Sequence, residues 1–194
     1  MISFSHLLSV MHCAGIVLIA LRAIMRHETR SGTPAIHERS AEAMNKNLSE
    51  RLAEAGGAPV QLGERQVRAL YELPCSEALS LGITFLESSA ARPQALPMKI
   101  DGGTLEVNGA SLKDVELWTD TAPPRFDVLV RAAKQRAVLK IWNQWRDERG
   151  TTQAWIGNAG IVVEERDREV ILRCSDGVGA PTFDDLVVQL ALKQ

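Results

Sequence analysis

The sequence has few of the residues on which common catalytic and metal sites depend. Its three cysteines, Cys13, Cys75 and Cys174, are odd in number and widely spaced, so neither a disulfide framework nor a CxxC site is indicated. We interpret them as reduced thiols, although a single Cys75–Cys174 bridge stays open. The four histidines end at His37 and share no ligand spacing, which excludes Ser-His-Asp and Cys-His catalysis from the C-terminal half.

The chain also lacks a surplus of either charge and a phosphate-binding loop. Its 22 Lys and Arg face 24 Asp and Glu, and the net charge is -2. A dedicated nucleic-acid binder would carry a basic field, so nucleic acid is not an expected partner. Neither Gly102-Gly103 nor the glycines between 157 and 160 match a P-loop or a dinucleotide fingerprint. What remains is the composition of a soluble globular protein with a real core.

The first 21 residues contain no Asp, Glu, Lys or Arg, and the apolar run Leu7–Met25 has Arg22 as its one formal charge. Such a run must be buried in protein or in lipid. Three interpretations stay open for residues 1–30: a membrane-associated helix, a helix packed on the domain, or a non-native extension. The run is a poor signal peptide, and the arginines at its end favour a cytoplasmic location for the rest of the chain. In the first interpretation the protein is associated with the inner membrane.

Residues 31–57 carry the signals of an amphipathic helix. Thr33 can cap its start, Pro34 suits the first helical position, and Gly56-Gly57 ends it. One narrow apolar stripe runs between these signals. The pattern predicts a helix over 34–55 that packs on a sheet or on a partner helix.

Residues 58–194 are predicted to form a β-rich domain. Residues 67–73 suit a strand or a helix, residues 83–86 a strand, and residues 88–97 a loop. From Met98 onward, alternating segments separated by turns, with Asn108-Gly109 the strongest hairpin signal, indicate about eight strands. The expected fold is mainly β, an antiparallel β-sandwich or jelly roll with N-terminal helices.

One segment could change that fold class. Arg125–Arg149 contains no Gly or Pro and is long enough for a helix. If it were helical, about six strands would remain and the domain would be α+β.

The four tryptophans Trp118, Trp142, Trp145 and Trp155 supply the first candidate site. On a strand, Trp142 and Trp145 are three residues apart and face opposite sides, so we expect one of them outside the core. An exposed Trp can stack on a sugar ring or anchor a partner. The predicted ligand-binding residues are Trp145 first, then Trp142 and Asn143. The alternative is that both indoles cover core edges and bond carbonyl groups.

Three aspartates supply the second candidate site. Asp176, Asp184 and Asp185 flank a glycine turn, and carboxylates that converge on a loop mouth can hold a hard cation such as Ca²⁺. The alternative is local, with each Asp bonding turn amides and capping a strand end. No other cofactor is implied.

The same stretch carries a resemblance. Asp176-Gly177 followed by Phe183–Val188 resembles the Asp-rich ending of several bacterial β-sandwich domains of unassigned function, and carbohydrate-binding jelly rolls often close on a similar strand. The tract from Trp142 to Val188 also resembles uncharacterised bacterial proteins. The resemblance implies a sandwich and supplies no activity.

These observations favour a non-catalytic binding or protein-interaction module with a protein or carbohydrate ligand. One alternative is a hydrolase, which predicts two or more buried acids with raised pKa values in one cleft. The other is a structural component tethered to a membrane through residues 7–25.

Overall fold

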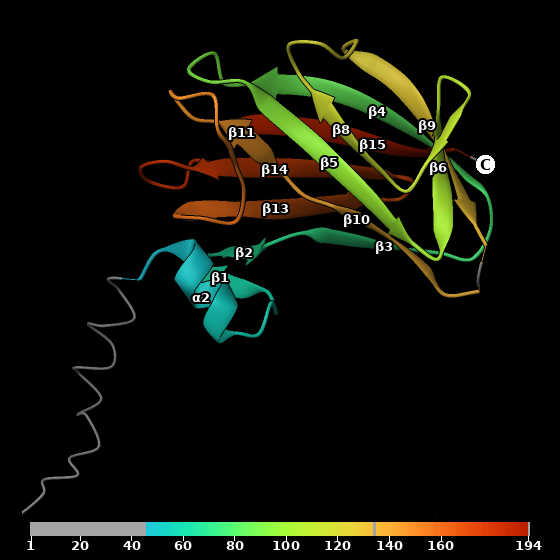
Figure 1. Cartoon of the computed structure of the whole chain (residues 1–194). Coiled ribbons are helices and arrows are strands. Elements are labelled where there is room, and N and C mark those ends of the chain that lie inside the picture. Colours follow the sequence, from blue (N-terminus) through green and yellow to red (C-terminus); the bar gives the residue numbers. More distant parts are fainter. Residues whose placement is uncertain (1–45, 134, 194) are drawn as a thin grey trace, which may run out of the picture. The chain divides into compact units, whose positions relative to one another are not determined.

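A computed structural model describes residues 46–133 and 135–193 of the chain. Within them lie one helix and fifteen strands, and the sheet pairings are antiparallel. Figure 1 shows the helix at one end of the strands. The prediction of a mainly β domain is confirmed. The predicted helix of residues 1–30 lies outside the described residues, and no helix inside them is long and apolar enough to cross a membrane.

The larger sheet has nine strands, which come from both the beginning and the end of the described sequence. Its order begins with the hairpin that follows the helix and ends with the Asn108-Gly109 hairpin. From one edge to the other the strands are β1 (Val60–Leu62), β2 (Arg65–Arg68), β13 (Asn158–Arg166), β14 (Glu169–Gly177), β15 (Leu186–Lys193), β4 (Leu79–Ser88), β9 (Arg125–Ala132), β6 (Gly103–Val107) and β7 (Ala110–Leu112).

The smaller sheet is built around one long central strand. β5 (Gln94–Asp101) pairs on one side with β8 (Asp114–Trp118). On its other side it pairs with two strands in one continuous register, β10 (Ala137–Ile141) and β11 (Gln144–Arg146). The outer neighbours are β3 (Tyr71–Cys75), which pairs with β10, and β12 (Thr152–Gln153), which pairs with β11.

A proline explains why β10 and β11 are separate strands. Met98 pairs with Ile141 and Ala95 with Gln144, so the same register places Pro97 opposite Trp142. The carbonyl of Pro97 accepts a hydrogen bond from the Trp142 amide at 3.2 Å. Proline has no N–H that could donate a second hydrogen bond to Trp142, and the pairing with β5 is interrupted at this point.

One core cluster takes side chains from both sheets. Leu96 and Leu139 come from the smaller sheet, and Leu81, Val128 and Leu172 from the larger. Val128, Leu139 and Leu172 alternate with less buried neighbours along their strands, whereas β5 around Leu96 is buried on both faces. A second, small cluster of Leu48, Val67 and Phe183 holds the helix against the larger sheet.

Several local predictions can be compared with this arrangement. Asn108 and Gly109 have φ of 50° and 79°, as the predicted two-residue hairpin requires. The helical alternative for Arg125–Arg149 is wrong, because β9, β10 and β11 occupy it. The loop predicted for 88–97 is wrong after Pro93, since β5 begins at Gln94. The strands outnumber the predicted set because short hairpins and interruptions divide longer segments.

The helix α2 (Leu48–Glu54) begins later than the predicted 34–55 helix. Asn47 caps it with an extended ψ of 170°, its side chain accepts the Glu50 amide, and the Glu50 carboxylate accepts the Asn47 amide. This capping box sets the start of the helix at Leu48. The earlier part of the predicted 31–57 segment lies outside the described residues.

Candidate functional site

A gap in the outer edge of the smaller sheet forms the centre of the candidate site. β3 pairs with β10 up to Ile141, and β12 pairs with β11 from Trp145. Trp142 therefore lies between β10 and β11, where no described strand pairs with the outer edge of this segment. Trp155, two residues after β12, fills the gap and stacks against Trp142 with ring centroids 5.4 Å apart and planes 34° apart.

A hydrogen bond fixes the Trp155 ring across the gap. Its indole Nε1–H donates to the carbonyl of Ala69 at 3.2 Å, and Ala69 lies two residues before β3. Trp155 has a φ of 56°, a left-handed conformation in which a bulky side chain is an outlier. Such a conformation costs about 1–3 kcal/mol and persists where its surroundings enforce it. In spite of these restraints the side chain is 50% exposed.

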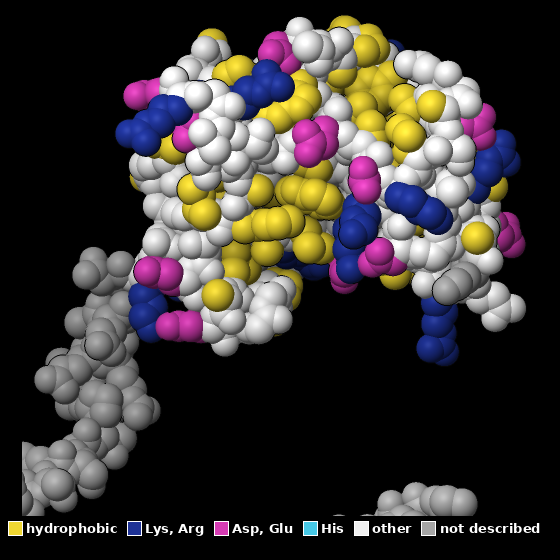
Figure 2. Space-filling view, in the orientation of Figure 1, with side chains coloured by type: hydrophobic (Ala, Val, Ile, Leu, Met, Phe, Trp, Pro, Cys, Tyr) yellow, Lys and Arg dark blue, Asp and Glu magenta, His cyan; other side chains and the backbone are white. Residues whose placement is uncertain are grey.

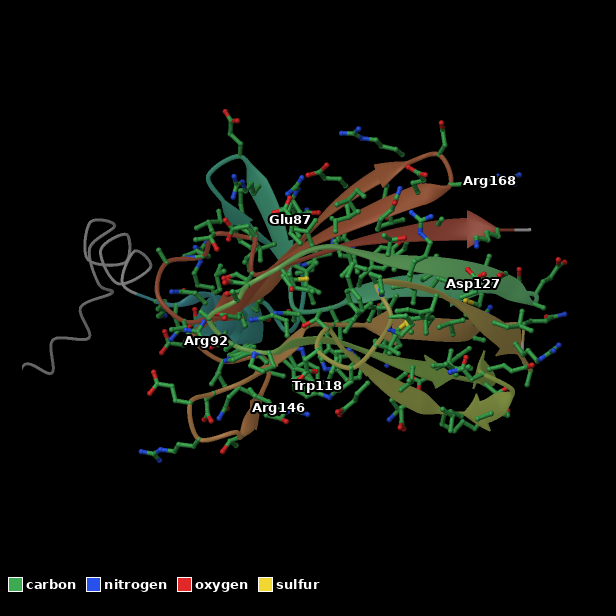
Figure 3. All side chains as sticks on the ribbon, turned by 90° about the horizontal axis from the view of Figure 1, so that it is seen from above. Glu87, Arg92, Trp118, Asp127, Arg146 and Arg168 are labelled. Atoms are coloured by element: carbon green, nitrogen blue, oxygen red, sulfur yellow. The ribbon has the colours of Figure 1, made fainter. Side chains whose placement is uncertain are left out.

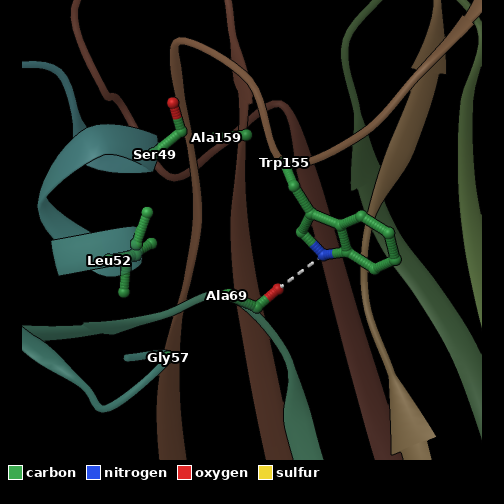
Figure 4. A pocket seen from close by; sticks show the side chains of 7 residues that line it. Ser49, Leu52, Gly57, Ala69, Trp155 and Ala159 are labelled. Atoms are coloured by element: carbon green, nitrogen blue, oxygen red, sulfur yellow. Dashed lines mark hydrogen bonds between the residues drawn. The ribbon is translucent and has the colours of Figure 1, made fainter. Parts of the chain in front are cut away.

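A hollow of about 220 Å³ lies between Trp155 and α2. Figure 4 shows the indole on one side and the helix on the other, and Figure 2 shows hydrophobic side chains gathered on the face above the helix. The one side-chain hydroxyl in its wall, on Ser49, already donates to Asn47 Oδ1 at 2.8 Å. We call this the apolar hollow; its lining is Ser49, Leu52, Ala53, Gly57, Ala69, Trp155 and Ala159.

Two turns that touch each other, one at Ile156-Gly157 and one at Gly177–Gly179, separate this hollow from a second one. A Cβ on Gly157 would lie 2.3 Å from the Gly177 carbonyl oxygen, and a Cβ on Gly177 would lie 2.3 Å from that of Ile156. Asn158 Nδ2 also donates to the Gly179 carbonyl at 2.6 Å. The turns hold the exposed side chains of Ile156 and Val178 at the same end of the domain as Trp155.

The second hollow, of about 260 Å³, lies beside Trp145. We call it the polar hollow; its lining is Arg92, Trp145, Asp147, Glu148, Arg149 and Val178. Asp147 accepts the Arg149 and Thr151 amides at 2.9 and 2.8 Å, and these bonds within its own hairpin lower the pKa of its carboxyl group, Thr151 contributing most.

The expectation that Trp145 is the exposed tryptophan is wrong. Its side chain is 1% exposed because Gly177 lies against it, where even a Cβ would approach Trp145 Cη2 to 2.9 Å. The predicted ligand residue Asn143 is buried too, and its Nδ2 donates to the Ser175 carbonyl at 2.9 Å. Trp142 is half-buried, so of the three predicted residues it alone contributes to the exposed aromatic pair.

The three predicted aspartates do not form a ligand set. Asp176 is fully buried and forms an ion pair with Arg92, while Gln94 Nε2 donates to the same carboxylate oxygen at 3.1 Å. Asp184 is exposed. Asp185 Oδ2 accepts the Asp176 amide at 3.0 Å, and burial raises the pKa of the Asp185 carboxyl group. Within the described part of the chain no three His, Cys, Asp or Glu side chains are grouped to hold a metal ion.

The predicted calcium site is therefore not formed, and the local alternative describes these residues. Asp176 Oδ1 accepts the Val178 amide at 3.1 Å, which is the turn bond expected of an Asp-Gly sequence. Its other oxygen is used by Arg92 and Gln94. These contacts tie the end of β14 to the residues that begin β5.

The outer face of the smaller sheet carries one further aromatic contact. The Arg146 guanidinium lies 3.9 Å from the ring centroid of Trp118, a cation–π arrangement. Figure 3 shows Arg92 and Arg146 toward one end of the domain, Trp118 nearer its middle beside Arg146, and Asp127 and Arg168 toward the other end. Trp118 is 8% exposed, so Arg146 covers it and leaves Trp155 as the exposed ring.

The two described cysteines, Cys75 and Cys174, are free and buried. Burial raises the pKa of both thiols, which makes them poor nucleophiles at neutral pH.

Sequence reasoning included Trp155 among four candidate tryptophans but chose Trp145 and Trp142 as ligand residues, and it missed the other residues that line the apolar hollow. Trp155 and Ile156 stand directly before Gly157 in a turn, and two large apolar residues at a turn are the one signal that could have indicated them. Ala69 and α2 reach the site only through the pairing of distant strands. The sequence matches no protein-family model and no curated protein, and the fold matches no solved structure.

Proposed function

We propose that this chain is a non-catalytic binding module that recognises an apolar group in the hollow beside Trp155. The observation that carries the proposal is the state of Trp155: half exposed, held in a left-handed conformation, and fixed by its bond to Ala69. Strained residues cluster at ligand sites, where their surroundings keep them in place. A preoriented aromatic ring beside a hollow loses little freedom when it binds.

The chemistry of the wall favours an apolar group over a sugar. A sugar site needs several side-chain donors and acceptors around the aromatic ring, because each hydroxyl that loses water must be bonded again. Here the lining is aliphatic apart from Trp155 and Ser49, and the Ser49 hydroxyl already has a partner. An aliphatic side chain or an acyl chain fits this wall best.

The proposal includes the finer fold assignment and a location. We propose that the two sheets form a β-sandwich, since one core cluster draws on both of them. We also propose a cytoplasmic location, supported by the two free thiols.

One observation favours a second function, a hydrolase that uses carboxylates. Asp176 and Asp185 are neighbours, and the pKa of Asp185 is raised by burial and by the charge of Asp176. Neither aspartate lines the apolar or the polar hollow, and the Arg92 ion pair occupies Asp176. The pair supports a structural role better than general acid and base chemistry.

Calorimetric titration of the full chain with three small probes tests the binding function. 1-Hexanol and N-acetyl-leucinamide carry aliphatic groups, and methyl glucoside offers a sugar ring. We expect the two aliphatic probes to bind and the glucoside not to. Trp155→Ala should weaken the binding of both aliphatic probes about tenfold, which is roughly the effect of removing one aromatic side chain from the wall of the hollow.

Leu86→Ala is the matched control, because Leu86 is 49% exposed on β4 and lies outside the hollow. Its affinities should equal those of the wild type. Binding of methyl glucoside alone, or equal losses in the two variants, would contradict the assignment of an apolar group to this hollow.

A further inference from the structure

A further hollow, of about 370 Å³, adjoins the apolar hollow, and the two share Gly57 and Ala69 in their walls. Figure 4 shows both of these residues on the side of the apolar hollow that lies below the indole ring. Arg68 and Glu72 also line the further hollow, so we call it the charged hollow. A ligand that fills the apolar hollow and extends past the shared residues would meet these two charges.

Arg68 is held next to the residue that fixes the Trp155 ring. It is the last residue of β2, and its neighbour Ala69 accepts the hydrogen bond from Trp155 Nε1 at 3.2 Å. β2 belongs to the larger sheet and β3 to the smaller one, so this short segment connects the two sheets. Arg68 is paired with Ile161 on β13, which fixes its backbone. The cation and the aromatic ring therefore keep a constant relation to each other.

The Arg68 guanidinium has a neutral partner. Its Nη2 donates to Gln66 Oε1 at 3.2 Å, and among the residues that the structure describes no ion pair joins it to a carboxylate. The side chain is half-buried. A guanidinium carries five N–H donors in a planar fork, so one bond to an amide leaves donors for a ligand. The acceptor that matches such a fork best is a carboxylate or a phosphate.

Glu72, the carboxylate in the same wall, has a cation of its own. It lies directly across from Lys140 in the pairing of β3 with β10, and the ion pair of Lys140 with Asp101 has a distance of 2.7 Å. The bond with Asp101, and to a smaller degree the charge of Glu72, raises the pKa of Lys140. Glu72 is exposed and Arg68 is half-buried, so solvent screens Glu72 more. Arg68 should therefore attract a ligand carboxylate more strongly than Glu72 repels it.

We propose that the ligand is a small aliphatic carboxylate, whose apolar part lies beside Trp155 and whose carboxylate accepts hydrogen bonds from Arg68. This rests on the proposed function, which it narrows from an apolar group to an aliphatic acid in its ionised form. The two hollows, of about 220 and 370 Å³, are together within the size range of small-molecule sites. An ammonium group in place of the carboxylate would meet the like charge of Arg68.

Calorimetric titration of the full chain with two matched pairs of probes tests the proposal. Hexanoate differs from 1-hexanol, and N-acetyl-leucine from N-acetyl-leucinamide, chiefly in the carboxylate. At neutral pH we expect each acid to bind about fivefold more tightly than its neutral counterpart, which is the effect of one charge-assisted pair at a partly exposed site. This preference should shrink in high salt, because salt screens the attraction.

Three variants at two arginines locate the carboxylate. Arg68→Gln should bring the members of each pair to equal affinity and leave the neutral probes unchanged, because the apolar wall stays. Arg68→Lys keeps the charge but loses the fork, so part of the preference should remain. Arg168→Gln is the matched control, since it removes the same charge from the exposed turn between β13 and β14, toward the other end of the domain (Figure 3). It should keep the full preference. Circular dichroism verifies that the variants keep the sheets.

Equal affinities of each acid and its neutral counterpart in the wild type would overturn the proposal and leave the proposed function standing, with a neutral apolar ligand. A preference that survives Arg68→Gln would also overturn it, because the carboxylate would then bind elsewhere. If none of the four probes binds, the proposal and the proposed function both fall.

Discussion

The apolar and polar hollows lie on either side of the same two touching turns, and each has a tryptophan in its wall. Trp145 in the polar hollow is 1% exposed, and Trp155 in the apolar hollow is 50% exposed. Behind Trp145, Asp176 is bonded to Arg92, Gln94 and the Val178 amide. Behind Trp155, one hydrogen bond fixes the ring and the face stays open. The polar side therefore holds this end of the fold together, while the apolar side has no such network, which is why we propose it as the ligand site.

The largest expected effect is on stability and separates the two tryptophans. Trp145→Ala removes a buried indole and should lower the free energy of unfolding by about 3–5 kcal/mol. Trp155→Ala should lower it by about 1 kcal/mol, because half of the ring is already exposed and a single hydrogen bond is lost, while alanine keeps the Cβ and with it the left-handed strain. Urea unfolding of both variants measures the difference. Equal losses would show that Trp155 is a core residue and break the comparison.

The second effect concerns the ion pair of the polar side. Arg92→Met leaves the buried Asp176 carboxylate without its cation. This should lower the free energy of unfolding by about 2–3 kcal/mol, which is less than for a fully buried pair because Arg92 is partly exposed. The control is Arg131→Met, whose exposed pair with Glu106 should contribute under about 1 kcal/mol. Chemical denaturation at neutral pH compares them. A loss for Arg92→Met no larger than for the control would remove the structural role given to Asp176.

The smallest effect is a pH dependence from Asp185. Burial raises the pKa of this carboxyl group above its ordinary value, so the folded state holds the proton more tightly than the unfolded state. Stability should therefore fall as the pH rises from about 3.8 through the folded pKa, and level off above it. Asp185→Asn should remove this fall, which is smaller than the two effects above. Unfolding curves measured between pH 3 and 7 follow it, and an unchanged slope in the variant would contradict the assignment.

The sequence predicted the class of the fold better than the faces of its strands. Asn108-Gly109 identified a hairpin because its two residues tolerate positive φ. The spacing of Trp142 and Trp145 led us to expect one of them outside the core, but that Trp145 is the buried one depends on Gly177, thirty or more positions away. Pro97 suggested a loop, yet it lies in a central strand at the point where the neighbouring strand is interrupted.

The candidate site was less predictable for the same reason. Its wall combines α2, Ala69 ahead of β3 and the turn after β12, and these come together only because β3 pairs with β10 and β12 with β11, which both lie along β5. The positive φ of Trp155 leaves no pattern in the residue string, since any residue type can be forced into it by its surroundings.

The most direct test of the account is the spectrum of the indole Nε1–H groups, of which the chain has four. Trp155→Phe assigns the resonance of Trp155 and Trp145→Phe that of Trp145. On addition of 1-hexanol to the full chain, we expect a large shift of the Trp155 resonance and none for Trp145. A shift of Trp145 with Trp155 unmoved would contradict it, because the ligand would then occupy the polar side.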